Sequence, residues 1–345
     1  METRGGHFSD DYGPHRLSVE LANVCNLHCS YCFRSEDNLY SRHAEFFPLE
    51  LLRRIVSEAR EAAHITRVNF TGGEPTLHPQ FAQILETIAA ADLQASFVTN
   101  GWHFERVWPA LSNNRQAISH VAFSIDGIER ETHDHWRGNG SFDRLIRAFS
   151  RCYISRLPFA IKIVVRRDLV DQLEQIAIFA ARLGAAALNF VHVMPTSRGF
   201  ENDFALTRDE QRAAEEEIAI LARIFKMNIG IDVGYYNVEE QRAPCSPLAG
   251  KSMNVDYRGR LSLCCNLSGF RGAAAEPDVV ADLNTESFSS ALVKLRELAS
   301  AQLQKRKDAL ATLRAKGTTP DLYVGSPCLF CLQSYGKIPW HNGAH

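Results

Sequence analysis

Three cysteines, Cys25, Cys29 and Cys32, lie within eight residues of one another near the start of the chain. They follow residues 16–22, whose composition predicts a β-strand, so the thiols lie on a loop at the strand's end. Cysteines spaced this closely are typical of metal centres. Three such thiolates can hold three irons of a [4Fe–4S] cube and leave the fourth iron free. A zinc knuckle that also uses His28, and unrelated core thiols, are the alternatives.

The composition of the chain indicates a globular protein of a reducing compartment. The 345 residues include nine cysteines, are 45% hydrophobic and carry a net charge of −2. This balance gives no overall basic field for nucleic acid, and no apolar run is long enough to cross a membrane. The polar N-terminus lacks a secretion signal, so we expect a cytoplasmic protein with free thiols.

The middle of the chain alternates apolar strands with amphipathic helices, a pattern that predicts parallel βαβ units. We expect strands at residues 16–22, 67–70, 95–99, 121–125, 160–165 and 188–194, with a last apolar stretch at 229–233. We expect helices at residues 48–63, 79–91, 142–155, 170–183, 207–225 and 288–315. Six such units predict an α/β fold, a partial (β/α)6 TIM-like barrel, with its chemistry at the carboxyl ends of the strands.

The first cysteine loop resembles that of the radical S-adenosylmethionine (SAM) superfamily. Residues 24–33, VCNLHCSYCF, match the family's cluster loop, including the aromatic Tyr31 before the third cysteine. The resemblance implies that Cys25, Cys29 and Cys32 hold a [4Fe–4S] cluster whose free iron binds SAM. One electron from the cluster would cleave SAM to methionine and a 5′-deoxyadenosyl radical, which abstracts a hydrogen atom from the substrate.

Other predicted strand ends carry further matches to the family. Residues 71–75, TGGEP, are similar to its GGEP motif, whose carbonyls and Glu74 would accept hydrogen bonds from the SAM ammonium. Residues 123–127, FSIDG, and the Arg137 that follows look like its SAM-contacting fourth-strand region. For Asn100 and Met194 an ordinary turn and core packing are the alternatives. The expected SAM-contacting residues are Tyr31, Gly72, Gly73, Glu74, Asn100, Ser124, Asp126, Arg137 and Met194.

A second group of cysteines lies near the other end of the chain. Cys245, then Gly259 followed after four residues by Cys264, then Cys328 and Cys331, resemble the twitch domain, a shortened SPASM extension. The resemblance implies one auxiliary [4Fe–4S] cluster with four thiolate ligands; a four-cysteine zinc ribbon is the alternative. We therefore expect a core barrel over residues 14–236 and a twitch-like domain over 237–345.

Two cysteines remain outside these sets. Cys152 falls on the apolar face of the helix expected at 142–155, so core packing explains it. Cys265 directly follows Cys264 and either replaces it as a ligand or donates a hydrogen atom to a substrate radical.

The resemblance implies a radical SAM enzyme that oxidises or cross-links a peptide or a small metabolite, with the auxiliary cluster as electron acceptor. An epimerase with a cysteine hydrogen donor, and a non-catalytic iron–sulfur or zinc protein, are the alternatives. The expected partners are that substrate and an electron donor such as flavodoxin or ferredoxin, without nucleic acid or membrane. The 24 residues before Cys25 are too few for a leader-recognition domain, so a separate partner would deliver a peptide.

Overall fold

The computed structural model describes residues 16–34, 43–194, 204–236, 245–270 and 276–338. These residues form a ten-stranded sheet in the order β10-β9-β8-β1-β2-β3-β4-β5-β6-β7. The strands are β1 (Arg16–Glu20), β2 (Arg67–Thr71), β3 (Gln94–Thr99), β4 (Ile118–Ile125), β5 (Phe159–Val165), β6 (Ala187–His192), β7 (Asn228–Val233), β8 (Ser252–Val255), β9 (Arg260–Ser262) and β10 (Val279–Asp282). Strands β1 to β7 are parallel to their neighbours, which confirms the predicted partial barrel.

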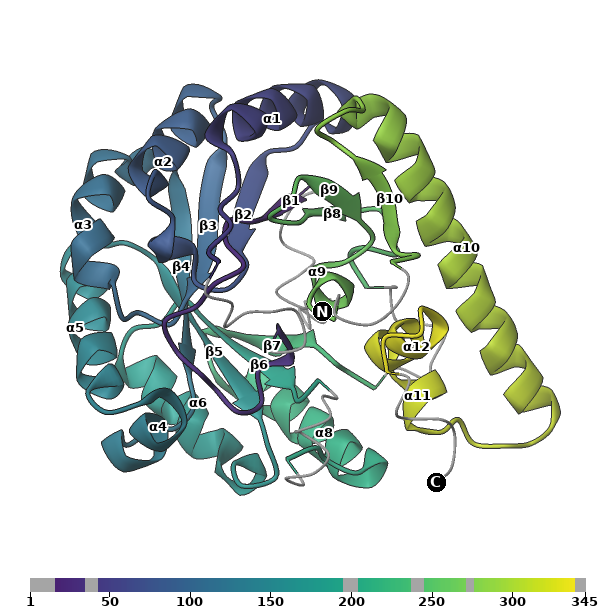
Figure 1. Cartoon of the computed structure of the whole chain (residues 1–345). Helices are drawn as coiled ribbons and strands as arrows, with labels where there is room; N and C mark the ends of the chain where they lie inside the picture. The colour runs from purple at the N-terminus through teal and green to yellow at the C-terminus, as the bar shows by residue number, and fades with distance from the viewer. Residues whose placement is uncertain (1–15, 35–42, 195–203, 237–244, 271–275, 339–345) are drawn as a thin grey trace.

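Helices form an arc on the outside of these strands (Figure 1). They are α1 (Leu49–Ala63), α2 (Phe81–Ala90), α3 (Phe104–Asn113), α4 (Arg130–Arg137), α5 (Ser141–Ile154), α6 (Leu173–Arg182) and α8 (Arg208–Ile224). Short 3-10 helices η2 (Pro75–Leu77), η3 (Arg115–Ala117) and η4 (Val170–Gln172) occur in the connections. The C-terminal part adds α9 (Cys265–Ser268), α10 (Phe288–Ala315), α11 (Leu322–Gly325) and α12 (Pro327–Ser334).

Alternation along the strands separates an apolar outer face from a polar inner face. In β1, Leu17 and Val19 are fully buried in the hydrophobic core, whereas Ser18 lines the cavity inside the barrel. The same alternation occurs in β2, where Val68 belongs to the core and Asn69 lines the cavity. The helices therefore pack on the outer face, and the polar residues are left to line the interior.

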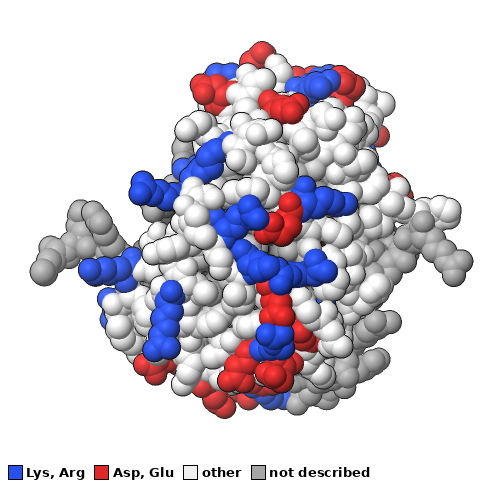
Figure 2. Space-filling model, turned by 90° about the vertical axis from the view of Figure 1, so that its left-hand side faces the viewer, with Lys and Arg blue, Asp and Glu red and all other residues white. Residues whose placement is uncertain are grey.

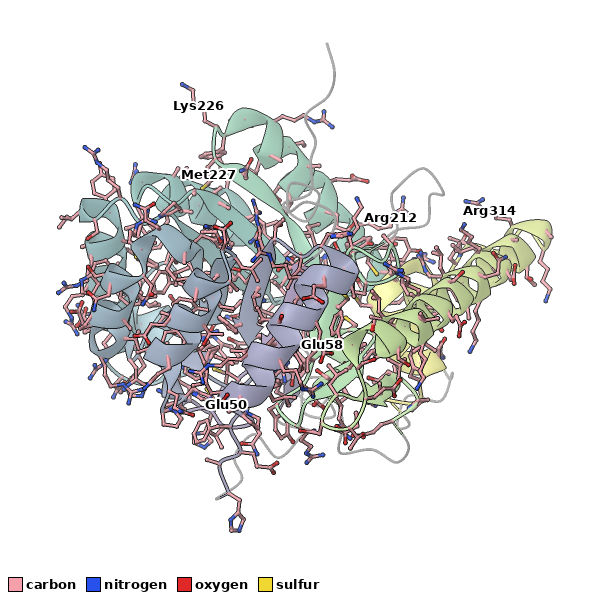
Figure 3. The ribbon with its side chains drawn as sticks, turned by 90° about the horizontal axis from the view of Figure 1, so that it is seen from above. Glu50, Glu58, Arg212, Lys226, Met227 and Arg314 are labelled. Atoms are coloured by element: carbon pink, nitrogen blue, oxygen red, sulfur yellow. The ribbon has the colours of Figure 1, made fainter. Side chains whose placement is uncertain are left out.

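The C-terminal hairpin extends the barrel sheet. Strand β8 pairs in parallel with β1, opposite Ser18 at Asn254, and β9 returns antiparallel to β8 through the predicted turn at Gly259. Figure 3 shows Glu58 of α1 on the side toward the C-terminal region. Its carboxylate accepts a hydrogen bond of 2.7 Å from the backbone N–H of Phe288, in the first turn of α10. This contact ties the outer helix layer to the C-terminal region.

Two helices of the barrel were not predicted from the sequence. Helix α3 contains Pro109, a residue that usually ends a helix. Helix α4 is almost entirely polar and follows a strand end that we interpreted only as a SAM-contacting loop. The predicted helix at 288–315 agrees with α10 at both ends.

The outer face of α3 and α5 carries mixed charge. Lys and Arg side chains lie among Asp and Glu side chains over this face (Figure 2). Arg151 of α5, for example, pairs with Glu105 of α3 at 2.8 Å. In the part of the chain that the structure describes, no helix combines the length and apolar character needed to cross a membrane.

Candidate iron–sulfur and SAM site

One cavity of about 390 Å³ lies inside the barrel and reaches the C-terminal region. It brings together the thiols of the first cysteine group with most of the second group and most of the expected SAM-contacting residues. Of the predicted site residues it is lined by Cys25, Cys29, Tyr31, Cys32, Gly72, Gly73, Glu74, Asn100, Ser124, Arg137, Met194, Cys245, Cys264, Cys265 and Cys328. Asp126 and Cys331 lie outside this lining.

The glycine turn after β2 packs directly against the residues that precede the first cysteine. The backbone N–H of Gly73 donates to the carbonyl of Ala22 at 2.8 Å, and that of Glu74 donates to Val24 at 2.9 Å. Gly72 has a φ of 121°, and a Cβ atom there would lie 2.5 Å from the Ala22 carbonyl oxygen. Only glycine fits this close approach, so the turn fixes the start of the cysteine loop.

The Glu74 carboxylate is buried and already engaged by protein donors. Its Oε1 accepts from the Thr76 hydroxyl at 2.6 Å and from the Thr99 hydroxyl at 2.8 Å, and its Oε2 accepts from the Asn100 N–H at 2.8 Å. Glu74 therefore joins the ends of β2 and β3. The glycine-rich backbone beside it is the more open part of the predicted ammonium site.

Asn100 connects the end of β3 to the cysteine loop. Its Nδ2 donates to Asn26 Oδ1 at 3.0 Å and lies 3.7 Å from Cys25 Sγ. The backbone N–H of Leu27 also donates to Cys25 Sγ, at 3.4 Å. N–H groups directed at a sulfur stabilise its thiolate form, which is the form that binds iron.

The three thiols of the first group are close enough to influence one another's ionisation. Burial, with Glu74 as a further cause, raises the pKa of Cys25 to about 12, and Cys29 and Cys32 add to the rise. Burial also raises the pKa of Cys32, with Cys29 as the next cause. Burial without a metal keeps these thiols neutral, and bound iron would stabilise their thiolate form. This donor set therefore fits an iron–sulfur cluster.

Asp126 joins a predicted SAM-contacting residue of the first cysteine loop to one of α4 from behind the cavity wall. The carboxylate is fully buried and accepts hydrogen bonds from the hydroxyl of Tyr31 and the Nε of Arg137. Arg137 also donates to the Tyr31 hydroxyl at 2.9 Å. Asp126 thus orients two cavity-lining side chains that we expected to contact SAM.

Arg166, at the end of β5, is a member of this cluster that the sequence analysis missed. Its Nη1 lies 3.0 Å from Asp126 Oδ1, its side chain is fully buried, and its guanidinium lies 4.0 Å from the ring centroid of Trp136. The sequence did hold one signal for Arg166, since it is a charged residue directly after an apolar strand. Arg166 Nε also pairs with Asp168 Oδ1 at 3.0 Å, so the two arginines are matched by two carboxylates.

The second group of thiols surrounds a small cavity of about 30 Å³. All four predicted ligands line it, namely Cys245, Cys264, Cys328 and Cys331. The remaining wall is mainly apolar: Pro247, Leu248, Leu263, Asn266, Leu267, Pro327 and Leu332. Burial raises the pKa values of Cys245, Cys328 and Cys331 to about 12. Four converging thiols form the donor set that closed iron–sulfur clusters and structural zinc sites share.

The structure distinguishes Cys265 from Cys264. Cys265 lines the large cavity but not the small one, whereas Cys264 lines both. A contact between the two thiols lowers the pKa of Cys265 to about 7 and raises that of Cys264. This placement favours Cys264 as the fourth thiol of the second group. Cys152 is fully buried on α5 within the core, as its position in the sequence predicted.

A buried ion pair joins the loops that carry the two thiol groups. Arg34, two residues after Cys32, donates to Glu20 Oε2 at 3.1 Å. Glu20 also accepts from the Ser268 hydroxyl, whose oxygen lies 2.9 Å from the carbonyl oxygen of Cys265. Sequence analysis did not single out this network, because its members lie 248 residues apart.

Among the described residues, no three His, Cys, Asp or Glu side chains are grouped as a site for a single metal ion.

Residues 19–180 match the family model of the radical SAM superfamily. This part of the chain, just under half of its length, resembles the radical SAM superfamily.

Curated proteins resemble the chain over part of its length. Mycofactocin maturase MftC of Mycolicibacterium smegmatis is 33% identical over 57% of this chain and 49% of its own length. PqqA peptide cyclase of Methylocella silvestris is 27% identical over 73% of this chain and 68% of its own. The chain thus spans about half the length of the MftC relatives that it matches.

Solved structures share the fold of this chain. Streptococcus suis SuiB bound to S-adenosylmethionine aligns with a TM-score of 0.64 at 14% identity, covering 83% of this chain and 68% of SuiB. Native anSMEcpe with bound AdoMet aligns with a TM-score of 0.61 at 19% identity, covering 82% of each chain. The coverage extends beyond the matched family model, so the likeness of fold includes part of the C-terminal region.

Proposed function

We propose that this chain is a radical SAM enzyme that acts on a peptide, with one SAM-binding [4Fe–4S] cluster and one auxiliary [4Fe–4S] cluster. The observation that carries the proposal is the shared cavity, because thiols of both cysteine groups line it together with the glycine turn and Arg137. A substrate in this cavity would contact the walls of both centres. We divide the chain accordingly into a SAM-binding core, residues 14–236, and an auxiliary region, 237–345; residues 14–15 and 237–244 lie outside the described residues.

Each proposed ligand set fits its cluster. Cys25, Cys29 and Cys32 would hold the first cluster, and the four thiols around the small cavity would hold the second. When bound, the SAM-loaded cluster supplies a 5′-deoxyadenosyl radical that abstracts a hydrogen atom from the substrate. A closed auxiliary cluster supplies an electron acceptor, and a flavodoxin or ferredoxin would reduce the first centre.

The residues around the cavity orient SAM and exclude water. Arg137, held by Asp126, presents its positive charge toward the predicted SAM carboxylate. The carbonyl groups and turn of Gly72 and Gly73 face the predicted ammonium, and buried Met194 closes the wall beyond β6. Radical chemistry benefits from this enclosure, since solvent access permits side reactions.

Similar proteins support a peptide as the substrate class. They include a PqqA peptide cyclase, SuiB bound to the precursor peptide SuiA, and anSMEcpe with bound AdoMet and a Cp18Cys peptide. We therefore propose oxidation or cross-linking of a peptide by this chain.

Epimerisation is a second candidate outcome, because the Cys265 thiol lines the large cavity without belonging to the four-thiol site. A thiol in that position could return a hydrogen atom to a substrate radical. Incubation in deuterated water would separate the two outcomes, since a thiol donor introduces one deuterium at the attacked carbon.

Anaerobic reconstitution tests the proposed centres. We expect about eight irons and eight sulfides per chain, and 5′-deoxyadenosine that forms only with SAM and dithionite. About four irons would contradict the auxiliary cluster. A colourless zinc protein, or an iron–sulfur protein without SAM cleavage, would contradict the enzyme.

A further inference from the structure

Polar side chains line the inside of the barrel at mid-strand positions, where barrels usually pack branched apolar residues. We call this set the inner belt. Its residues are Ser18, Asn69, Ser96, His120, Lys162, Asn189 and Asn254, all of which line the large cavity. Their neighbours along the strands, such as Leu188 and Phe190 beside Asn189, belong to the hydrophobic core. Lys162 and Asn189 come three residues before their strands end, so they lie inside the barrel and not on the loops at its rim.

Some donors and acceptors of the inner belt already have partners in the protein. The Ser96 hydroxyl donates to Asn69 Oδ1 at 3.0 Å, and Asn254 Nδ2 lies 3.0 Å from the Ser262 hydroxyl. These contacts bind strands to one another and need no ligand.

Asn189 differs from Asn69 and Ser96 and shares with Asn254 an amide oxygen that has no partner among the described residues. Its residue is 3% exposed, and within the described residues its Oδ1 atom is buried without a hydrogen-bond partner. A buried amide oxygen without a donor costs about 1–3 kcal/mol of stability. Because the side chain lines the cavity, a donor inside that cavity would satisfy it.

Lys162 is the neighbour of Asn189 on the adjacent strand. The two residues are register partners in the parallel pair of β5 and β6. The Lys162 ammonium pairs with Asp232 of β7, and the two side chains, each 23% exposed, also line the cavity. An ammonium has three donor hydrogens, so donors remain after one bond to Asp232. The wall therefore offers a cationic donor beside an unpaired acceptor.

We propose that Lys162 and Asn189 form a docking site for the main chain of a peptide, with Asn189 Oδ1 accepting a backbone N–H and Lys162 donating to a carbonyl. A carboxylate alone would leave Asn189 without a donor, and an ammonium would be repelled by Lys162. An amide unit supplies a donor and an acceptor together. The inference rests on the proposed peptide substrate and locates its binding site.

The position of this pair suits a substrate beside SAM. Ser124, a proposed SAM contact, is the register partner of Lys162 on β4. A peptide bound at Lys162 and Asn189 would therefore lie one strand away from the proposed SAM wall. Recognition of backbone atoms also leaves the side chains of the peptide to be selected elsewhere in the cavity.

The test uses the reconstituted holoenzyme with SAM and without reductant, so that no turnover occurs. The probe is acetyl-tetra-alanine amide, and the matched probe carries methyl groups on its backbone nitrogens. Saturation-transfer NMR titration measures both. We expect at least about tenfold weaker binding of the methylated probe, and a similar loss for Asn189→Leu with the unmethylated probe, because each change removes one hydrogen bond to a buried acceptor.

Variants separate docking from folding. Lys162→Met should also weaken the probe about tenfold, while Lys162→Gln, which keeps an N–H donor, should recover part of the binding. Ser96→Ala removes a belt hydroxyl that already has a partner, and we expect probe binding to change less than twofold. Melting temperatures of all variants identify any that fail to fold.

Two results would overturn the docking site. One is equal binding of both probes by the folded wild-type protein, and the other is no binding of either. Neither result bears on SAM cleavage, since dithionite-dependent 5′-deoxyadenosine is measured separately on the wild type. Loss of that activity with normal probe binding would instead contradict the proposed function and leave the docking site in place.

Discussion

Glu20 and Arg34 form a buried ion pair with a second contact of 3.1 Å between Arg34 Nη2 and Glu20 Oε1. Neither residue is a proposed ligand, yet the pair lies between the two thiol groups. Arg34 Nη2 also lies 3.5 Å from the carbonyl of Cys265, and Asn254 Nδ2 lies 3.3 Å from Glu20 Oε1. The end of β1, the first cysteine loop and the second cysteine region are therefore held by one carboxylate.

Replacing Glu20 with Leu should destabilise the protein strongly. The change leaves the Arg34 guanidinium buried without its counter-charge, which costs about 3–5 kcal/mol. Glu20→Gln keeps the hydrogen-bonding shape and should cost less. Urea unfolding of both variants measures the difference, and an exposed pair such as Arg53 and Glu50 supplies the control, since Glu50→Gln should change stability by less than about 1 kcal/mol. Equal effects of Glu20→Leu and Glu50→Gln would contradict the bridging role.

The two proposed clusters should be separable by mutation. Cys25→Ala should abolish 5′-deoxyadenosine formation, because SAM would lose the iron that binds it. Cys328→Ala should lower the iron content by about four per chain while SAM cleavage persists in part. Iron analysis and chromatography of the products measure both, with Cys152→Ala as the buried-thiol control. Complete loss of SAM cleavage in both cluster variants would argue against separate roles.

Cys264 and Cys265 should behave differently although they are adjacent. Only Cys264 lines the small cavity with the other three thiols, so Cys264→Ala should lower auxiliary iron and Cys265→Ala should leave it unchanged. Mössbauer spectra of the two variants provide the readout. Retention of the full iron content in Cys264→Ala would show that its neighbour takes its place.

Gly269 allows the two cysteine regions to pack closely. A Cβ atom at this position would lie 2.1 Å from the ring of Phe33, which is stacked on Phe270 at 5.6 Å. Gly269→Ala should therefore cost about 1–3 kcal/mol of stability through overpacking. Phe33→Leu combined with Gly269→Ala should recover part of that loss, because the smaller side chain makes room. Thermal unfolding of the single and double variants decides whether the contact matters.

His133 should make stability fall in mild acid. Burial, then the neighbouring Arg137, lowers the pKa of His133 from 6.5 to about 4. The unfolded chain binds a proton below pH 6.5 that the folded protein does not accept until about pH 4. Stability is thus complete above pH 6.5 and decreases toward pH 4, by up to about 3 kcal/mol for this residue.

His133→Asn should flatten that pH dependence, since an amide does not titrate there. Its oxygen can replace Nδ1, which accepts the N–H of Asp126 at 3.2 Å. Melting temperatures between pH 5 and 7.5 give the comparison, and His135→Asn, an exposed neighbour, is the control. An unchanged slope in His133→Asn would contradict the assignment.

The sequence predicted the parts of this fold that depend on local patterns. Apolar runs located β1 to β7, and spacing along the chain separated the two cysteine groups. Helix α3 was missed because Pro109 masks its periodicity, and packing of Phe104 and Leu111 overrides that local preference. The pairing of β8 with β1 was missed because a short hairpin shows no partner in its own sequence.

Sequence analysis singled out those parts of the candidate site that carry a motif and missed those that depend on distant partners. The glycine turn and the cysteines stood out by spacing. Arg166 and Glu20 did not, since a single charged residue acquires meaning only when the fold buries it beside its partner. Glu74 is the opposite case, a residue that a motif singled out for contact with a ligand. Its carboxylate is held mainly by Thr76, Thr99 and Asn100 of the protein itself.

The parallel pairing of β1 with β8 has a consequence for any shortened version of the chain. Four register pairs, from Arg16 with Ser252 to Val19 with Val255, cover that edge of β1. A protein truncated before residue 245 would leave the N–H and C=O groups on this edge of β1 unpaired, and a strand of another molecule could then pair with them. Self-association would then accompany the loss of the proposed auxiliary cluster when the region from residue 245 onward is removed.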